Sequence, residues 1–272
     1  RSSKFFGIAL EAGWTFWHQH KQDTAGAVAE FVRLWAEHKD KNYLYSKTDV
    51  SWEVLNLDGQ ELLKLYALKY AGFPYVVDNP LDFQVQTNFE VFPDSSLKGI
   101  EFTSYIDCIA RLKKTGEPLI IDCKTAGNAI PELVVLDPQL RSYSWVKHYP
   151  NVAFLWFRKM GRTVSKGDPI TMLEPYAGLN PGDDAVVLAK DDFGFFVTTD
   201  ETVAESLDTQ FIGKSKAVEA ERQQFVAKNS RHVLESTFTK QRLYFKAAVI
   251  SEESANDIGR AIQQDIISIV SA

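Results

Sequence analysis

The chain has 272 residues, of which 45% are hydrophobic and 24% charged, an ordinary balance for a globular protein with a substantial core. A formal net charge of −6 argues against a generally basic coat for nucleic acid but leaves room for a local basic groove. No apolar run reaches the ~20 residues of a membrane helix. No charged-then-apolar leader opens the sequence, so we expect an intracellular protein with no membrane partner.

The cysteine content narrows the cofactors that the chain can hold. The two cysteines, Cys108 and Cys123, each follow an aspartate within a strand-like run. A cysteine-ligated iron–sulfur cluster needs more thiolates than this. We therefore expect no such cluster and interpret both residues as buried, reduced thiols that act as small hydrophobes.

Helices are predicted in the first quarter of the chain. From Asp23, the run DTAGAVAEFVRLWAEHK is typical of a helix with an aspartate N-cap. Its apolar stripe consists of Val28, Phe31, Val32 and Trp35. A second helix is predicted from about Gly59 to Tyr70, and Gly72 can end it.

Three strands of an antiparallel meander are predicted next. Apolar and polar residues alternate in DFQVQTNFEVF and again in LKGIEFTSYIDCIARL, and PLIIDCK follows the turn KKTGE. Asp107 lies on the polar face of the second strand, and Asp122 and Lys124 share one face of the third. If these two strands pair around the turn, we expect the three side chains to converge at one end of the sheet.

This convergence has two interpretations. Asp107, Asp122 and the backbone carbonyl of Cys123 are hard oxygen donors of the kind that suits Mg²⁺ or Mn²⁺, and Lys124 would then serve the water or the phosphate beside the ion. The alternative is a surface pair of Asp122 and Lys124 beside an unrelated aspartate, since charge pairs on strands are common. Spacing alone does not decide between them.

A helix–strand crossover and further elements complete the predicted fold. LDPQLRSYSWVKHY has Asp137 as N-cap and Pro138 at the first helical position, and NVAFLWF is typical of a strand covered on both faces. AVVLAKDDFGFFVTT predicts a hairpin, and ETVAESL and KAVEAERQQFVAK predict helices. The final helix has an apolar stripe of Ile258, Ile262, Ile266 and Ile269, which we expect to face the core rather than a partner.

These elements predict an α/β fold with a mixed sheet flanked by helices and with an extra C-terminal hairpin and helices. No linker marks an independent second domain, so we expect one domain over residues 1–272. Within it we expect a helical part over 1–75, a catalytic sheet and motif helix over 76–160, and the C-terminal hairpin and helices over 161–272.

Three segments together resemble the PD-(D/E)XK nuclease superfamily and, within it, the RecB-like exonuclease branch. They are the strand with Asp107, the run IIDCKTAG with Asp122 and Lys124, and the helical QLRSY with Gln139 and Tyr143. The resemblance extends over roughly residues 8–158. It implies a restriction-endonuclease-like fold and a metal-dependent DNA nuclease that acts in recombination, repair or phage DNA processing. The cytoplasm of a bacterium or a phage-infected cell would be its location.

The resemblance also implies roles for individual residues. Asp107 and Asp122 would hold Mg²⁺ or Mn²⁺, Lys124 would assist the attack of water, and Gln139 and Tyr143 would position the lysine or the DNA strand. Members of the branch begin with a helix whose histidine approaches the metal. In GWTFWHQHKQDT this histidine would be His18, with His20 as the alternative ligand.

Basic residues near these motifs favour DNA as the partner. The predicted phosphate contacts are Arg111, Lys113, Lys114, Arg141 and Arg158. Ordinary solvated charge is the competing interpretation for each of them. A homo-oligomer or a recombination partner protein stays open, and so does a catalytically silent DNA-binding or assembly subunit with the same fold.

Overall fold

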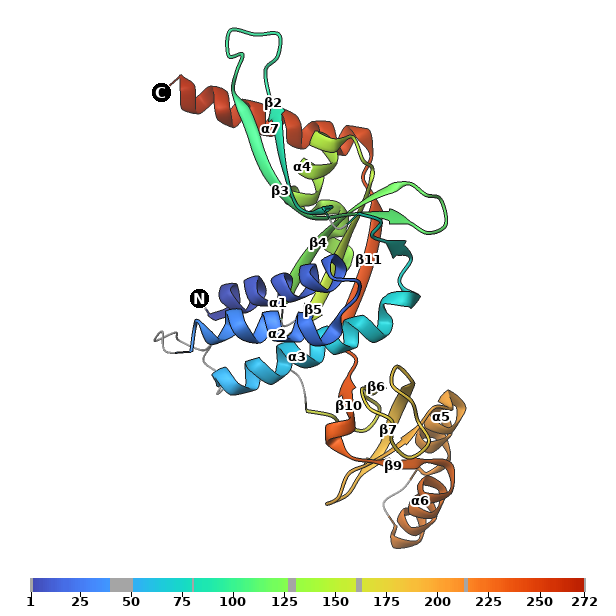
Figure 1. Ribbon diagram of the computed structural model, residues 1–272. Helices are drawn as coiled ribbons and strands as arrows, with labels where there is room; N and C mark the ends of the chain where they lie inside the picture. Colours follow the sequence, from blue (N-terminus) through green and yellow to red (C-terminus); the bar gives the residue numbers. More distant parts are fainter. Residues whose placement is uncertain are drawn as a thin grey trace. The chain divides into compact units, whose positions relative to one another are not determined.

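The computed structural model describes residues 2–39, 51–79, 81–126, 131–159, 163–212 and 215–271 (Figure 1). The chain divides into two compact units, each built from distant segments. The first unit combines Arg1–Asp49, Gly72–Arg158 and Leu243–Ala272, and the second combines Val50–Ala71 and Lys159–Arg242. This division does not follow the three consecutive parts expected from the sequence, and a single nuclease domain over residues 1–272 stays a prediction.

The first unit contains a mixed sheet, which confirms the α/β class. Its strands are β1 (Tyr75–Val76), β2 (Phe83–Glu90), β3 (Glu101–Leu112), β4 (Pro118–Ala126), β5 (Asn151–Arg158) and β11 (Leu243–Val249). The order is β1-β3-β4-β5-β11, with β2 also paired to β3. Among the strand pairs that the structure describes in this sheet, β4 and β5 are the parallel pair, as expected of strands joined by a helical crossover.

Helices flank this sheet. α1 (Ser2–Gln19) and α2 (Thr24–Ala36) form a helical hairpin whose rings pack edge to face, with Phe6 5.8 Å from both Phe31 and Trp35. The predicted N-cap of α2 is confirmed, because the Asp23 carboxylate accepts from the Gly26 amide at 3.0 Å. The crossover from β4 to β5 contains a 3₁₀ turn (Pro131–Leu136) and α4 (Pro138–Lys147), whose predicted Asp137 cap is also confirmed.

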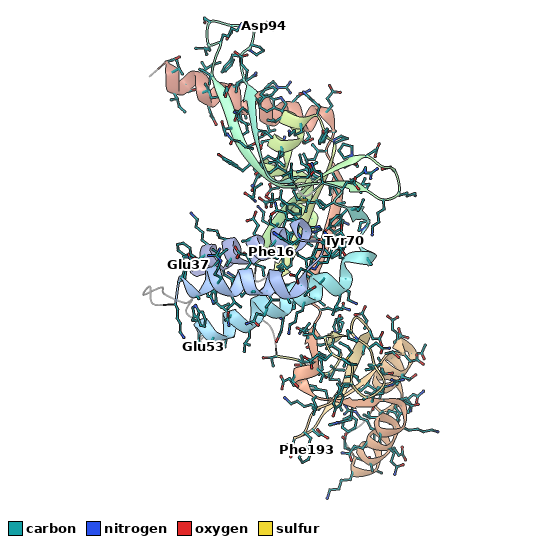
Figure 2. All side chains as sticks on the ribbon, in the orientation of Figure 1. Phe16, Glu37, Glu53, Tyr70, Asp94 and Phe193 are labelled. Carbon is teal, nitrogen blue, oxygen red and sulfur yellow. The ribbon has the colours of Figure 1, made fainter. Side chains whose placement is uncertain are left out.

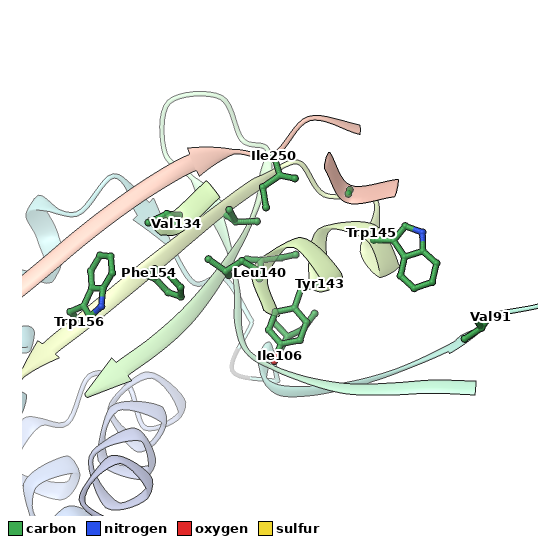
Figure 3. Close-up of a cluster of buried hydrophobic side chains, with 12 residues drawn as sticks. Val91, Ile106, Val134, Leu140, Tyr143, Trp145, Phe154, Trp156 and Ile250 are labelled. Atoms are coloured by element: carbon green, nitrogen blue, oxygen red, sulfur yellow. The ribbon is translucent and has the colours of Figure 1, made fainter. Parts of the chain in front are cut away.

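One hydrophobic cluster of the first unit lies between α4, the sheet and α7 (Glu252–Val270). Figure 3 shows Leu140 and Tyr143 of α4 turned towards the strands, whereas Trp145 lies on the other side of the helix. Ile258, Ile262 and Ile266 of α7 pack against this cluster, as predicted. The prediction is wrong for Ile269, which is 76% exposed, because the last turn of α7 extends beyond the core.

The second unit contains a five-stranded antiparallel sheet with helices. Its elements are α3 (Trp52–Lys69), β6 (Pro169–Met172), β7 (Asp184–Lys190), β8 (Phe195–Thr198), α5 (Glu201–Gln210), α6 (Lys216–Asn229), β9 (Arg231–Val233) and β10 (Phe238–Lys240). The strand order is β10-β6-β7-β8-β9. The predicted hairpin and the two predicted helices are confirmed as β7–β8, α5 and α6.

The predicted start of α3 is wrong. The helix begins at Trp52 rather than Gly59, because the Ser51 hydroxyl accepts from the Val54 amide and so caps an earlier turn. The side chains of Leu62, Leu63, Tyr66 and Tyr70 are buried. In the part of the chain that the structure describes, no helix has both the length and the apolar character needed to cross a bilayer.

Candidate active site

The candidate site lies where two paired strands separate. β3 and β4 pair from Arg111 opposite Pro118 to Cys108 opposite Ile121. Beyond this point β3 continues its pairing with β2, and β4 continues with β5. Asp107 and Asp122 are the residues at the point of separation. Because β3 and β4 are no longer paired here, side chains at this point can contact residues of the neighbouring helices.

Asp107, Asp122 and Lys124 come together as predicted. The Asp107 Oδ2 atom accepts a 2.8 Å hydrogen bond from the backbone amide of Cys123, which ties β3 to β4 beyond their last ladder pair. Asp122 is only 1% exposed, and its Oδ2 lies 2.5 Å from the Lys124 ammonium. The interpretation of Asp122 and Lys124 as an exposed surface pair therefore fails, since the carboxylate is buried.

A chain of hydrogen bonds holds Lys124 from the side of α4. The Lys124 ammonium donates to Gln139 Oε1 at 2.9 Å, and Gln139 Nε2 donates to the Tyr143 hydroxyl at 2.6 Å. The Tyr143 hydroxyl donates to the backbone carbonyl of Tyr105 in β3 at 2.6 Å. Burial raises the pKa of Tyr143 to about 12, so this hydroxyl keeps its proton and remains a donor. Gln139 and Tyr143 thus position the lysine.

Glu11 of α1 is a site residue that the sequence analysis missed. Its carboxyl shares a hydrogen bond with Asp107 and accepts another from the Gln84 side-chain amide of β2. Close packing of α1 on β4 brings it there, because a Cβ at Gly7 would lie only 2.9 Å from Thr125 Oγ1. A signal was present in the sequence: Glu11 is a lone carboxylate in the apolar run FFGIALEAGW, one helical turn after Gly7.

The three carboxyls are buried close together and perturb one another. Burial, and then the negative charges of Asp107 and Asp122, raise the pKa of Glu11 to about 8. Burial, and then the charge of Asp107, raise the pKa of Asp122 to about 7 although Lys124 opposes the shift. The pKa of Asp107 is raised by burial as well. Buried acidic groups that repel one another are characteristic of sites that receive a cation or a proton.

These carboxyls are of the ligand type that a hard divalent cation prefers, although their present placement does not form a metal site. Carboxylate oxygens are the ligands that Mg²⁺ and Mn²⁺ prefer, and a cation would offset the mutual repulsion of Glu11, Asp107 and Asp122. As their side chains stand, the described residues contain no group of three or more His, Cys, Asp or Glu that could hold a metal ion. The carbonyl of Cys123 as a further ligand stays a prediction. Burial raises the pKa of the Cys123 thiol. Neither Cys123 nor Cys108 forms a disulfide.

The two candidate histidines pack against aromatic rings, and a metal-ligand role for either stays a prediction. His18 lies in an aromatic cluster with Trp14, Trp17 and Phe83, at ring-centroid distances of 5.9, 4.9 and 4.9 Å. Burial lowers the pKa of His18 to about 3. His20 stacks on Phe16 at 3.8 Å. Glu11, two helical turns before His18, is the residue of α1 that lies beside Asp107.

The basic residues predicted to contact DNA differ in their contacts. Arg141 donates two hydrogen bonds to the Ser254 carbonyl, at 3.1 and 2.7 Å, and so holds α7 to α4. Arg111 forms an ion pair with Asp78 at 2.6 Å. Lys113 and Lys114 are exposed in the turn between β3 and β4, ~20 Å along β3 from Asp107.

Of these cations, Arg158 lies nearest to the site along the strands. It is opposite Ala126, two residues beyond Lys124 on β4. DNA contact by each of the five cations stays a prediction.

Comparison of the chain with protein-family models, with curated proteins and with solved structures finds no match.

Proposed function

We propose that this protein is a divalent-metal-dependent DNA nuclease of the RecB-like type, with a restriction-endonuclease-like core in its first unit. One observation carries the proposal. Buried Asp122 lies with Asp107, Glu11 and Lys124 where β3 and β4 separate, and the lysine is held by Gln139 and Tyr143. A merely structural ion pair has no need of two further buried carboxyls beside it.

The residues of the candidate site would have different roles in phosphodiester hydrolysis. Glu11, Asp107 and Asp122 would hold Mg²⁺ or Mn²⁺, which when bound lowers the pKa of a water and offsets charge on the phosphate. The oxygen of an attacking water bonds to phosphorus, the bond from phosphorus to the leaving oxygen breaks, and a proton passes from the water to solvent while the leaving oxygen takes one up. The Lys124 ammonium, kept in place by Gln139, orients that water or stabilises the charge that develops on the phosphate.

We infer that the enzyme is an exonuclease in recombination, repair or phage DNA processing. The test is incubation of the purified protein with linear DNA and with closed circular plasmid, each in Mg²⁺, Mn²⁺ or EDTA. We expect degradation of linear DNA that depends on the metal and stops in EDTA. Closed circles should persist, because they offer no end.

Asp122→Asn is the decisive variant. A neutral amide is a far poorer ligand for a hard cation than a carboxylate, so we expect cleavage to fall to background while the fold is kept. Asp257→Asn is the matched control, since Asp257 is an exposed carboxylate on α7 paired with Arg260. Wild-type rates from Asp122→Asn would place the active site elsewhere. DNA binding without cleavage under every metal would favour the catalytically silent subunit.

A further inference from the structure

Gln84 of β2 has an unusual backbone conformation beside the candidate site. β2 and β3 form a hairpin whose turn contains Asp94, which is labelled in Figure 2, and the ladder pairs on either side place Gln84 opposite Asp107. The φ angle of Gln84 is 50°, in the left-handed region. The other non-glycine residues with a positive φ, among those that the structure describes, lie outside the helices and strands. Gln84 therefore has this conformation where a strand would normally be extended.

The left-handed conformation is unfavourable for a glutamine. It brings the Cβ atom close to the backbone, and glycine and asparagine are the residues that adopt it most readily. Gln84 is exposed, so burial of its side chain does not account for the choice. A residue held in such a conformation indicates that its side chain meets a requirement that glycine would not.

The Gln84 side-chain amide contacts two of the three clustered carboxyls. Its Nε2 atom donates a hydrogen bond to Glu11 Oε1. The Asp107 carboxyl also accepts a hydrogen bond from Gln84. A primary amide carries two N–H donors, so one nitrogen can serve both carboxyls. Gln84 thus connects a residue of α1 to a residue of β3.

We propose that Gln84 is a positioning residue, which holds the Glu11 carboxyl beside the Asp107 carboxyl. The inference rests on the proposed function and adds a residue to its site. Neighbouring carboxylates repel each other, and a hydrogen-bond donor between them offsets part of that repulsion. Because the amide is uncharged, it does so without adding a fixed cation to the cluster. Gln84 in this role acts on the carboxyls and does not touch the phosphate.

Gln84→Met tests the positioning role. Methionine has a similar length but no donor, so the two carboxyls lose their common partner. We expect kcat on linear DNA to fall by about 10- to 100-fold with little change in KM. Gln86→Met is the matched control, because Gln86 is an exposed glutamine on the same face of β2 whose amide donates to Asn88 at 3.4 Å. It should leave kcat unchanged.

Gln84→Gly separates positioning from a role in folding. Like Gln84→Met it lacks the amide, but glycine adopts a positive φ without a Cβ clash. Thermal unfolding in EDTA should therefore show Gln84→Gly melting about 2–4 °C above Gln84→Met. We expect the two variants to have equally low kcat, because both lack the donor. A residue needed only for folding would instead recover kcat together with stability.

The outcomes separate the two proposals. Wild-type kcat in Gln84→Met overturns the positioning role and leaves the nuclease standing. A kcat for Gln84→Gly that rises with its melting temperature above that of Gln84→Met overturns it too, since Gln84 then serves the fold alone. If Gln84→Met does not fold, kcat of Gln84→Gly against that of Gln86→Gly decides. Wild type that cuts no DNA with Mg²⁺ or Mn²⁺ overturns the proposed function and the inference with it.

Discussion

At the scale of single residues, the candidate site is defined by how Lys124 is held. A lysine on a strand has a long flexible side chain, and fixing it costs conformational entropy. Here the ammonium is fixed from one side by Asp122 and from the other by Gln139, whose amide is in turn anchored by Tyr143. Such support places the charge before substrate arrives, which is a large part of what an enzyme contributes to a reaction.

Gln139→Leu should therefore reduce turnover, because Gln139 acts on the substrate only through Lys124. The leucine has similar size but cannot accept from Lys124, so the ammonium loses one of its two fixed partners. We expect kcat to fall by about 10- to 100-fold with little change in KM. Steady-state kinetics on linear DNA measures both.

Gln224→Leu is the matched control for this substitution, because Gln224 is an exposed glutamine on α6. The double variant Gln139→Leu with Lys124→Ala should be no slower than Lys124→Ala alone, since Gln139 acts through the lysine. Multiplying effects in the double variant would contradict the positioning role.

His18 should make the protein less stable in acid. In the folded state its pKa is lowered to about 3, whereas an unfolded histidine has a pKa of about 6.5. Between these values the unfolded chain binds the proton and the folded chain does not, so the stability is present above about pH 6.5 and is lost as the pH falls. His18→Phe, which cannot titrate, should gain about 3 kcal/mol relative to wild type between about pH 7.5 and about pH 4.5.

Urea unfolding of both proteins at the two pH values measures this difference. Because every other titrating group is common to the pair, the comparison isolates His18. An unchanged difference in unfolding free energy across the range would show that His18 is solvated when folded, contrary to its position among Trp14, Trp17 and Phe83.

At the scale of elements, α4 joins the candidate site to the rest of the first unit. One face supplies Gln139 and Tyr143, and another receives α7 at a close contact. A Cβ at Gly259 of α7 would lie 2.4 Å from the Trp145 ring, so the helices approach as closely as they do only because residue 259 has no side chain. Arg141 adds its two hydrogen bonds to Ser254 at the same junction.

Gly259→Ala should destabilise the first unit. Overpacking costs about 1–3 kcal/mol, which outweighs the gain in helix propensity of up to about 1 kcal/mol. Gly72→Ala is the control, because a Cβ there has no atom within 4 Å and the backbone has no positive φ. Thermal unfolding of the two variants measures the effect. A rise in melting temperature for Gly259→Ala would mean that α7 moves freely on α4.

At the scale of the whole molecule, each of the two units is stabilised by a different kind of buried interaction. The first has a large apolar cluster between α4, the sheet and α7. The second has, besides its apolar clusters, a buried ionic network in which Arg242 binds Asp58 and Glu61 of α3. The Arg242 and Asp58 side chains are each 1% exposed, so removing one partner leaves the other charged and buried.

Arg242→Ala should destabilise the second unit selectively, by about 3–5 kcal/mol. Tryptophan fluorescence and far-UV circular dichroism can separate the units. Only Trp52 belongs to the second unit, and the first contains Trp14, Trp17, Trp35, Trp145 and Trp156. On heating the variant, we expect an early transition in circular dichroism that fluorescence largely misses.

The control is Arg222→Ala, which removes a partly exposed pair with Glu219 worth about 0–1 kcal/mol. It should shift neither signal appreciably. Coincident transitions by both probes in Arg242→Ala would show that the chain unfolds as one cooperative body, in agreement with the single domain predicted from the sequence.

Local patterns in the sequence determined much of the framework. Alternation along 83–112 defined two strands and the face of Asp107, and the two-residue spacing of Asp122 and Lys124 put them on one face of the next strand, because the period of a strand is a property of neighbouring residues. The helix N-caps at Asp23 and Asp137 could likewise be predicted from the sequence, since a cap depends on amides two or three residues away. For the same reason Gln139 and Tyr143 could be placed on one helical turn.

Only the tertiary structure decided which groups meet. Nothing local pairs β11 with β5, or separates β3 from β4 at Asp107, because strand partners are chosen by packing across the whole chain. The presence of Glu11 in the carboxyl cluster has the same origin. The close approach of α1 to β4 at Gly7, a contact with Thr125 far along the chain, brings Glu11 there.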